Sequence, residues 1–556
     1  MKLRTYINIF CIAGMVSLLA ACKKDFLDVV PTDRLSEEAL LADSTLFESF
    51  VTNRYLGVRL QDKEDIPGFG RGFTWAMWAS LSDEAIYNND DNTWGIVRGL
   101  LAPENLGIAG TVWGRSYRSI RECNFALGNV AKVTMSAEHK NRLIAELKFI
   151  RAYRYFDLIT NYGGVILLGD KVYKLDDDFS DASIYTRSTI KQSIDYALAE
   201  LTAAASGLPA FNSSNWKLGR ATNGAALALK ARLALYAASP LYGAGSWADA
   251  AAAAKAVIDL NRYSIYTGGY RKLFLTPDNN EIIFERLYTK GASHFPLEIA
   301  CAPNGYGGWG GNTPLHNLVD DYETKDGKPI EDPTSGYSLQ NPYANRDQRF
   351  YETILFNGAP YRGRNVETFL PGGKDSKDGN ENWNTSKTGY LLLKFLNDEY
   401  PINNPWEVAG FQPWIYMRYA EVLLNYAEAQ NEAVGPDASV YSAINQIRQR
   451  PGINMPPLPA GLSQAQMRDR IRNERRVELA FEEHRFYDVR RWKIAMQTEN
   501  EPAYGIDVQK LGNGTFVYST KVALTGRKFE DKHHWLPIPR AEIQASNGKI
   551  SQNNGY

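Results

Sequence analysis

The sequence lacks the residue patterns on which several common classes of catalytic site depend. Across 556 residues there is no His-Glu-x-x-His pair, no Gly-x-Ser-x-Gly elbow and no phosphate-binding P-loop. These absences argue against a zinc protease, a serine hydrolase of that type and a nucleotide hydrolase. The six histidines are scattered, and the adjacent pair His533 and His534 has the wrong spacing for two ligands on one helix face. We therefore expect neither a metal centre nor a cofactor.

Cysteine and net charge are also scarce. The chain has four cysteines and no Cys-x-x-Cys motif, so neither a zinc ribbon nor a thioredoxin-like redox site is supported. Cys123 and Cys301 could form a disulfide in an oxidising compartment or remain free thiols. The formal net charge is −1, which gives no reason to expect a nucleic-acid partner, because such partners require a basic patch.

Long apolar runs are absent except near the N-terminus. Lys2 and Arg4 precede a mostly apolar run from Ile7 to Ala21, which at about 15 residues is too short to span a bilayer and is typical of a secretory signal. The run ends in Leu-Ala-Ala-Cys22, which resembles a bacterial lipobox. We expect residues 1–21 to be a lipoprotein signal peptide and Cys22 to be acylated, for example with palmitate. The alternative is an ordinary signal peptide with an incidental cysteine.

Helical periodicity dominates two parts of the chain. Large apolar residues recur at three- and four-residue spacing from Ala145 to Phe156 and from Ile415 to Ala429, and a long helix is predicted from Ser463 to about His484. We expect a mainly α fold with a helical scaffold over about 36–265 and 412–495. Helices paired at about 34 residues per pair suggest tetratricopeptide-like hairpins. A few short strands, such as 281–285, are expected beside them.

The segment from about 290 to 411 has a different composition. Glycine, asparagine, proline, aspartate and aromatic residues dominate it, and an irregular segment of this length in a compact protein is usually functional. Residues 305–310 read Gly-Tyr-Gly-Gly-Trp-Gly and formally match a dinucleotide-binding loop. Pro303 and Pro314 on either side do not fit the required strand and helix. We expect instead a flexible loop whose Tyr306 and Trp309 can face a ligand.

Several longer motifs resemble one family. Residues 475–492 (RRVELAFEEHRFYDVRRW) look like the C-terminal hallmark of SusD/RagB proteins, and 341–350 (NPYANRDQRF) is similar to another of their segments, with Gln348 where proline is usual. Four more segments resemble the family and stand in its order along the chain: YETKDGKPI (322–330), RYAEVLLNYAEA (418–429), LPIP (536–539) and the final QNNGY (552–556). The resemblance covers 22–556, which we treat as one SusD-like domain.

The resemblance implies a tetratricopeptide-like helical scaffold with a loop-rich, ligand-binding region. It implies a lipid-anchored protein on the outer face of the outer membrane, working with a SusC-like TonB-dependent transporter. The cargo would be oligosaccharide in most relatives and peptide in some. The protein itself would be a binding module and not an enzyme.

Aromatic side chains in polar segments are the candidate ligand contacts. Flat rings can stack on the C–H faces of sugars while neighbouring polar groups bind the hydroxyls. By analogy with relatives, we expect ligand contacts from Trp78, Trp94, Tyr306 and Trp309, with Tyr87, Asn92 and Asp83 as polar helpers. The competing interpretation is that these residues belong to the core or to a partner interface.

Two alternatives remain for the acidic residues. Glu474, Glu478 and Glu482 fall at four-residue spacing, and paired carboxylates are what a glycoside hydrolase needs. Arg475, Arg476 and Arg485 lie among them, which favours a structural ion-pair network instead. The clusters at 320–321 and 88–92 could bind calcium but match no EF-hand loop, and solvated turns explain them better.

Overall fold

The computed structural model describes residues 36–56, 72–90, 92–174, 176–214, 216–290, 294, 296–403 and 410–556. The expected signal peptide and Cys22 lie outside these residues, so both stay predictions. Within the described ranges, no helix combines the length and the apolar character needed to cross a membrane.

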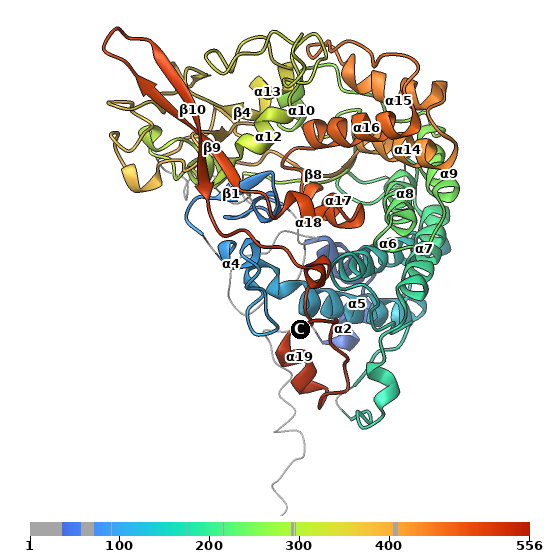
Figure 1. Ribbon diagram of the computed structural model, residues 1–556. Helices are drawn as coiled ribbons and strands as arrows, with labels where there is room; N and C mark the ends of the chain where they lie inside the picture. Colours follow the sequence, from blue (N-terminus) through green and yellow to red (C-terminus); the bar gives the residue numbers. More distant parts are fainter. Residues whose placement is uncertain are drawn as a thin grey trace, which may run out of the picture.

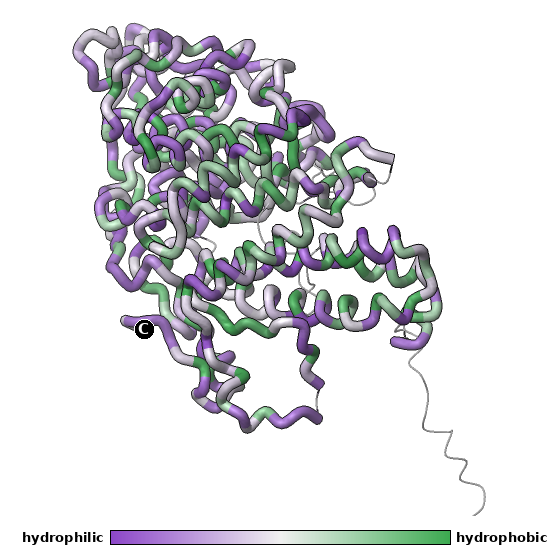
Figure 2. The backbone as a smooth tube through the Cα atoms, turned by 90° about the vertical axis from the view of Figure 1, so that its right-hand side faces the viewer, coloured by the Kyte–Doolittle hydropathy of each residue, from purple (hydrophilic) through white to green (hydrophobic). Residues whose placement is uncertain are grey.

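A row of packed helices forms one side of the molecule (Figure 1). Each helix packs against the next in the chain from α5 to α9, then α9 packs against α14, and α14 against both α15 and α16. Figure 2 shows hydrophobic and hydrophilic stretches alternating along these helices, as expected where one face is buried. The expected mainly α, tetratricopeptide-like scaffold is confirmed. Its helices are α5 (Val112–Asn129), α6 (Ala137–Tyr162), α7 (Ile190–Gly207), α8 (Asn223–Ala238), α9 (Trp247–Ile258), α14 (Tyr419–Val434), α15 (Ala438–Arg448) and α16 (Gln464–Glu478).

Local sequence signals fix the ends of these helices. The Thr189 and Ser463 side chains each accept a hydrogen bond from the backbone three residues on, and Gln192 and Gln466 complete the two capping boxes. At the C-terminal end of α6, Gly163 has a φ of 79°. Glycine adopts this left-handed conformation without the penalty that a Cβ would bring, so the helix stops there.

The remaining elements are short. The α-helices outside the row, among the described residues, are α2 (Glu37–Ala42), α3 (Ser44–Asn53), α4 (Trp94–Val97), α10 (Tyr270–Leu273), α11 (Leu297–Cys301), α12 (His316–Asp321), α13 (Gln348–Thr353), α17 (Arg485–Arg491), α18 (Ala495–Thr498) and α19 (Arg540–Ala545). The strands form two-stranded antiparallel pairs: β1 (Ala85–Tyr87) with β3 (Asn312–Pro314), β2 (Ile282–Arg286) with β8 (Trp414–Arg418), β4 (Ile354–Leu355) with β7 (Leu391–Leu392), β5 (Pro360–Tyr361) with β6 (Arg364–Asn365), and β9 (Ala503–Lys510) with β10 (Phe516–Leu524).

Two predicted helix boundaries are wrong. Ile415 lies in strand β8, not on the following helix, because its backbone pairs with Glu285 of β2. The last long helix ends at Glu478 and not near His484. Beyond it the backbone turns, with positive φ at Phe481 and Glu483, and this turn carries Glu482 to Arg418 and Lys394.

A buried ionic cluster joins the scaffold to the loop-rich half. Glu478 lies within 3.0 Å of nitrogens of Arg349, Arg418 and Arg450. Glu474 pairs with Arg349 and Arg448, and Glu482 pairs with Arg418. The structural interpretation of these carboxylates is therefore confirmed. Their partners, however, come from distant segments, while the nearby arginines bind other aspartates.

The two described cysteines are not joined to each other. Cys123 and Cys301 are buried and free, and burial raises the pKa of both thiols to about 11. A thiol with a raised pKa is a poor nucleophile, so these side chains act as small core residues.

Candidate ligand-binding surface

The β1–β3 pair is the framework of the candidate surface. Asn312, at the start of β3, is buried and makes three hydrogen bonds to the segment 75–80. Its Oδ1 accepts from the Met77 backbone N–H (2.8 Å) and the Ser80 hydroxyl (2.9 Å), and its Nδ2 donates to the Trp75 carbonyl (2.9 Å). One side chain thus fixes the segment that carries Trp75 against the strand that follows Trp309.

Trp75 and Trp309 form a stacked pair on this framework. Their ring centroids are 5.0 Å apart with an interplanar angle of 19°. Both side chains are half-buried, and the Trp309 backbone N–H donates to the Ile299 carbonyl (2.7 Å). An offset aromatic stack of this kind contributes about 0.5–1.5 kcal/mol beyond burial. The two indoles therefore hold each other in a fixed orientation near the surface.

The glycine-rich loop is tightly packed, which corrects the expectation of flexibility. A Cβ on Gly308 would lie 2.1 Å from the Ala302 carbonyl oxygen, and one on Gly311 would lie 2.5 Å from that of Ala300. The Gly310 and Gly311 backbone N–H groups donate to the same two carbonyls. These glycines are needed for close backbone approach to the end of α11, and they position Trp309 between them.

Tyr306 is held by contacts on one face and at its hydroxyl. The hydroxyl donates to the Tyr361 carbonyl (2.7 Å), and the Arg364 guanidinium carbon lies 3.7 Å from the ring centroid. Arg364 is itself fixed by a two-point pair with Asp375 at 2.6 and 2.8 Å. Burial raises the Tyr306 pKa to about 12. Tyr306 is half-buried, so part of its side chain remains available to a ligand.

Trp94 and Asn92 follow β1, at the same end of the β1–β3 pair as Asn312, because Tyr87 is paired with Asn312. The Trp94 indole N–H donates to the Tyr87 carbonyl (2.9 Å), and the ammonium of Lys387 is 4.9 Å from the ring centroid. Trp94 is half-buried, and Asn92 is exposed with a φ of 60°. Both remain candidate ligand contacts.

Three predicted contacts are buried and are corrected. Trp78 is only 6% exposed, and its ring packs on Phe486 and stacks on Tyr487 at 5.7 Å. Asp83 is buried between Arg476 and Arg485, whose charges outweigh the effect of burial and hold its pKa well below the usual range. Tyr87 is also buried. A buried ring has no free face for a sugar, so these residues support the surface from beneath.

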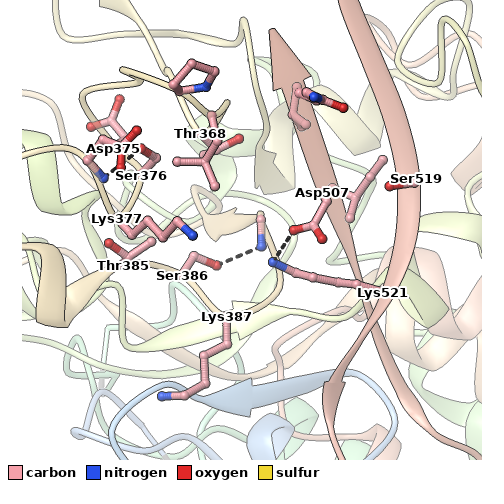
Figure 3. Close-up of a pocket in the computed structure, with 17 residues that line it drawn as sticks. Thr368, Asp375, Ser376, Lys377, Thr385, Ser386, Lys387, Asp507, Ser519 and Lys521 are labelled. Carbon is pink, nitrogen blue, oxygen red and sulfur yellow. Dashed lines mark hydrogen bonds and ion pairs between the residues drawn. The ribbon is translucent and has the colours of Figure 1, made fainter.

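A cavity of about 780 Å³ lies beside this surface, between the loop segment 368–389 and the β9–β10 hairpin (Figure 3). Its volume is within the range of about 300–1,000 Å³ usual for small-molecule sites. Hydroxyl and charged side chains supply much of its wall. Lys521 pairs across the hairpin with Asp507 at 2.8 Å, and Lys387 extends away from the cavity toward β1.

Sequence reasoning missed Trp75 as a surface residue and missed the cavity altogether. Trp75 sits three residues from the buried Trp78, and no periodicity distinguishes the two. The cavity depends on a hairpin more than a hundred residues from the loop that it faces, so no local pattern could predict it.

Comparison with known proteins agrees with this architecture. Residues 280–556 match the SusD family, and residues 25–235 match a second family of the same type, described as starch-binding and associating with the outer membrane. A SusD-like protein of Bacteroides fragilis shares 30% identity, with a TM-score of 0.77 over 95% of this chain and 100% of its own. The chain belongs to the SusD family.

Other members of the SusD family are similar over most of their length. A SusD-like carbohydrate-binding protein of Bacteroides fragilis is 26% identical, with a TM-score of 0.77 over 92% of this chain and 100% of its own. SusD-like protein P2 of Formosa agariphila is 24% identical over 482 residues, which is 81% of each chain. The similarity thus includes both the helical scaffold and the loop-rich half.

Glu474 and Glu478, in the last turn of α16, do not form a hydrolytic pair. A general acid for glycoside cleavage needs a raised pKa. Glu474 and Glu478 have lowered pKa values instead, because the charges of the surrounding arginines outweigh the effect of burial. Among the described residues, no group of three or more histidine, cysteine, aspartate or glutamate side chains could hold a metal ion.

Proposed function

We propose that this protein binds oligosaccharides at the cell surface and passes them to a SusC-like TonB-dependent outer-membrane transporter. The observation that carries the proposal is the stacked, half-buried pair of Trp75 and Trp309. Two fixed indoles offer a broad apolar surface to sugar C–H faces at little cost in side-chain entropy. Membership of a family with carbohydrate-binding relatives supports the same conclusion.

The test is affinity electrophoresis in native gels that contain soluble starch, laminarin, xylan, pectin or mucin glycans. We expect at least one polysaccharide to retard the wild-type protein. Trp309→Ala and Trp75→Ala should each weaken binding about ten-fold, which is the loss of about 1.4 kcal/mol of stacking. Trp309→Phe should keep part of the affinity, because it retains a ring.

Phe179→Ala is the matched control for these variants. Phe179 is an aromatic residue that is 42% exposed, and it contacts Tyr173 far along the chain from the tryptophan pair. Its loss should leave binding unchanged, and circular dichroism melts should show that all variants fold. No retardation of the wild type by any glycan would contradict the proposed function.

The protein should bind its ligand without breaking it. Glu474, Glu478 and Glu482 each lie at ion-pair distance from an arginine, so none of the three is free to act as the acid or the nucleophile of a glycosidase. Incubation with the retarding polysaccharide should release no new reducing ends. Release of reducing ends would favour the alternative of a surface glycoside hydrolase.

A peptide-binding role is the second candidate. Charges of both signs line the cavity, including Lys377, Asp378, Asp507 and Lys521, and a chemically mixed cavity suits a peptide backbone and its side chains. Mass spectrometry of ligands that co-purify with the protein would separate the candidates. Peptides without glycans would overturn the proposal of a saccharide ligand.

The anchor and the partner are also part of the proposal. We infer that Cys22 carries the lipid that attaches the protein to the outer membrane. Labelled palmitate should enter the wild type but not Cys22→Ser, and the variant should leave the membrane fraction. Pull-down of the membrane-extracted wild type should recover a TonB-dependent barrel.

A further inference from the structure

Trp383 is an exposed aromatic residue on a rigid loop. Its side chain is 70% exposed, and it lies in the short turn Asn382–Asn384, directly after Glu381 with a φ of 52°. A single exposed apolar side chain is common in soluble proteins. What distinguishes Trp383 is how firmly the structure holds the segment on both sides of it.

Two asparagines anchor that segment to the candidate ligand-binding surface. Asn304, beside Tyr306, donates from its Nδ2 to the carbonyls of Ser376 (3.2 Å) and Asn380 (2.8 Å). Asn88, beside the Trp94 turn, donates to the Thr385 carbonyl (2.9 Å) and accepts from the Lys387 backbone N–H (3.0 Å). The loop with Trp383 is therefore fixed to the same two segments that carry Tyr306 and Trp94.

The stretches on either side of Trp383 line the cavity described above. Asp375–Asp378 lie on one side and Thr385–Lys387 on the other. The cavity wall between these stretches is polar, with Lys377, Ser386 and Asp507 among its lining residues. The side chain of Lys377 is exposed and extends into the cavity (Figure 3), so its ammonium group can donate hydrogen bonds to the hydroxyls of a saccharide there.

We propose that Trp383 and this cavity form a second saccharide subsite. The exposed indole stacks on one sugar ring, and Lys377 in the cavity binds hydroxyls of the next. The subsite extends the surface that begins at Trp75 and Trp309, so affinity rises with the length of the oligosaccharide. This inference rests on the proposed function, because it assumes a saccharide ligand.

The test is isothermal calorimetry with disaccharides up to octasaccharides, prepared from whichever polysaccharide retards the wild type. For the longest oligosaccharides, Trp383→Ala should weaken binding about ten-fold. For disaccharides, which occupy the tryptophan pair alone, it should change the affinity less than two-fold. Trp309→Ala should weaken binding at every length. Trp383→Phe should recover part of the loss, and Lys377→Met should reduce affinity only for long ligands.

The outcomes separate this inference from the proposed function. If Trp309→Ala weakens binding while Trp383→Ala and Lys377→Met leave the longest ligands unaffected, the second subsite is wrong and the proposed function stands. If Trp383→Ala weakened the binding of disaccharides as much as that of octasaccharides, the second subsite would also be wrong. Trp383 would then belong to the same subsite as the tryptophan pair. If no glycan binds, or if the co-purified ligands are peptides alone, both proposals fail.

Discussion

Helix α8 and the last turn of α16 are both buried, yet they bury side chains of opposite kinds. In α8 the buried residues are alanine, leucine and tyrosine, with Gly224 and Arg232 as the exceptions. In the last turn of α16 they are Glu474, Arg475, Arg476 and Glu478 beside Val477. An apolar face can be satisfied by any well-fitting apolar neighbour, whereas each buried charge needs a particular partner.

The difference shows in where the partners come from. Helix α8 packs on α7 and α9, its neighbours in sequence. Glu478 is paired with arginines that lie 28, 60 and 129 residues away. The hallmark of the family is thus the central part of a network that ties the loop-rich half to the scaffold. Four predictions test this comparison, beginning with the largest expected effect.

Glu478→Gln should be the most damaging change. It leaves Arg349, Arg418 and Arg450 buried around a neutral amide, and breaking a buried pair typically costs about 3–5 kcal/mol. Urea unfolding at pH 7 measures the loss. Asp195→Asn is the control, because it breaks the exposed Lys191–Asp195 pair and should cost at most about 0.5 kcal/mol. Similar costs for the two variants would refute the distinction between the regions.

Leu229→Ala should destabilise the scaffold by about 3 kcal/mol, through lost burial and the cavity left behind. Leu229 is fully buried in α8. Leu229→Met should cost less than about 1.5 kcal/mol, since an apolar side chain of similar volume can repack. Urea unfolding of both variants checks this. If Leu229→Met lost as much free energy of unfolding as Leu229→Ala, the apolar core would not accept a different apolar side chain of similar volume, and the comparison with α16 would fail.

Glu285→Gln should stabilise the protein at alkaline pH. Glu285 is buried near the end of β2 without an arginine partner among the described residues, and burial raises its pKa from 4.5 to about 7. The folded state therefore keeps a proton that the unfolded state releases, so stability falls as pH rises from about 4.5 to 7. Glutamine should give a gain of about 1–3 kcal/mol at pH 8 and almost none at pH 4.

The measurement for Glu285 is urea unfolding of wild type and variant across pH 4–9. Glu478→Gln should be destabilising throughout the neutral and alkaline range, so the two glutamate variants have opposite signs at pH 8. A pH-independent difference for Glu285→Gln would show that its carboxyl group is not protonated in the folded protein near neutral pH.

Thr189→Ala should have the smallest effect, a loss of about 1 kcal/mol, because it removes the cap of α7. Thr202→Ala on the same helix is the control. Thr202 is exposed and bonds only to the Leu198 carbonyl of its own helix, so its loss should change stability by less than about 0.5 kcal/mol. Thermal unfolding of the two variants compares them directly.

Sequence patterns predicted the scaffold better than the candidate site. Ser463, the predicted start of the last long helix, is the N-cap of α16, because capping depends on residues three or four positions apart. Trp78 and Trp309 looked equally suitable as ligand contacts, yet Trp78 is enclosed by Phe486 and Tyr487, about 400 residues away. Exposure of an aromatic ring depends on such distant neighbours, so composition alone could not separate them.

The sequence by itself determined the family, the mainly α scaffold and the structural role of the hallmark glutamates. These follow from short-range periodicity, from capping and from motifs that survive in order along the chain. Only the tertiary structure decided which aromatic rings lie near the surface and which arginines pair with the glutamates of α16. It also decided that the stretches on both sides of Trp383 line a cavity. Each of these depends on contacts between segments far apart in the chain, and the chain must fold before they exist.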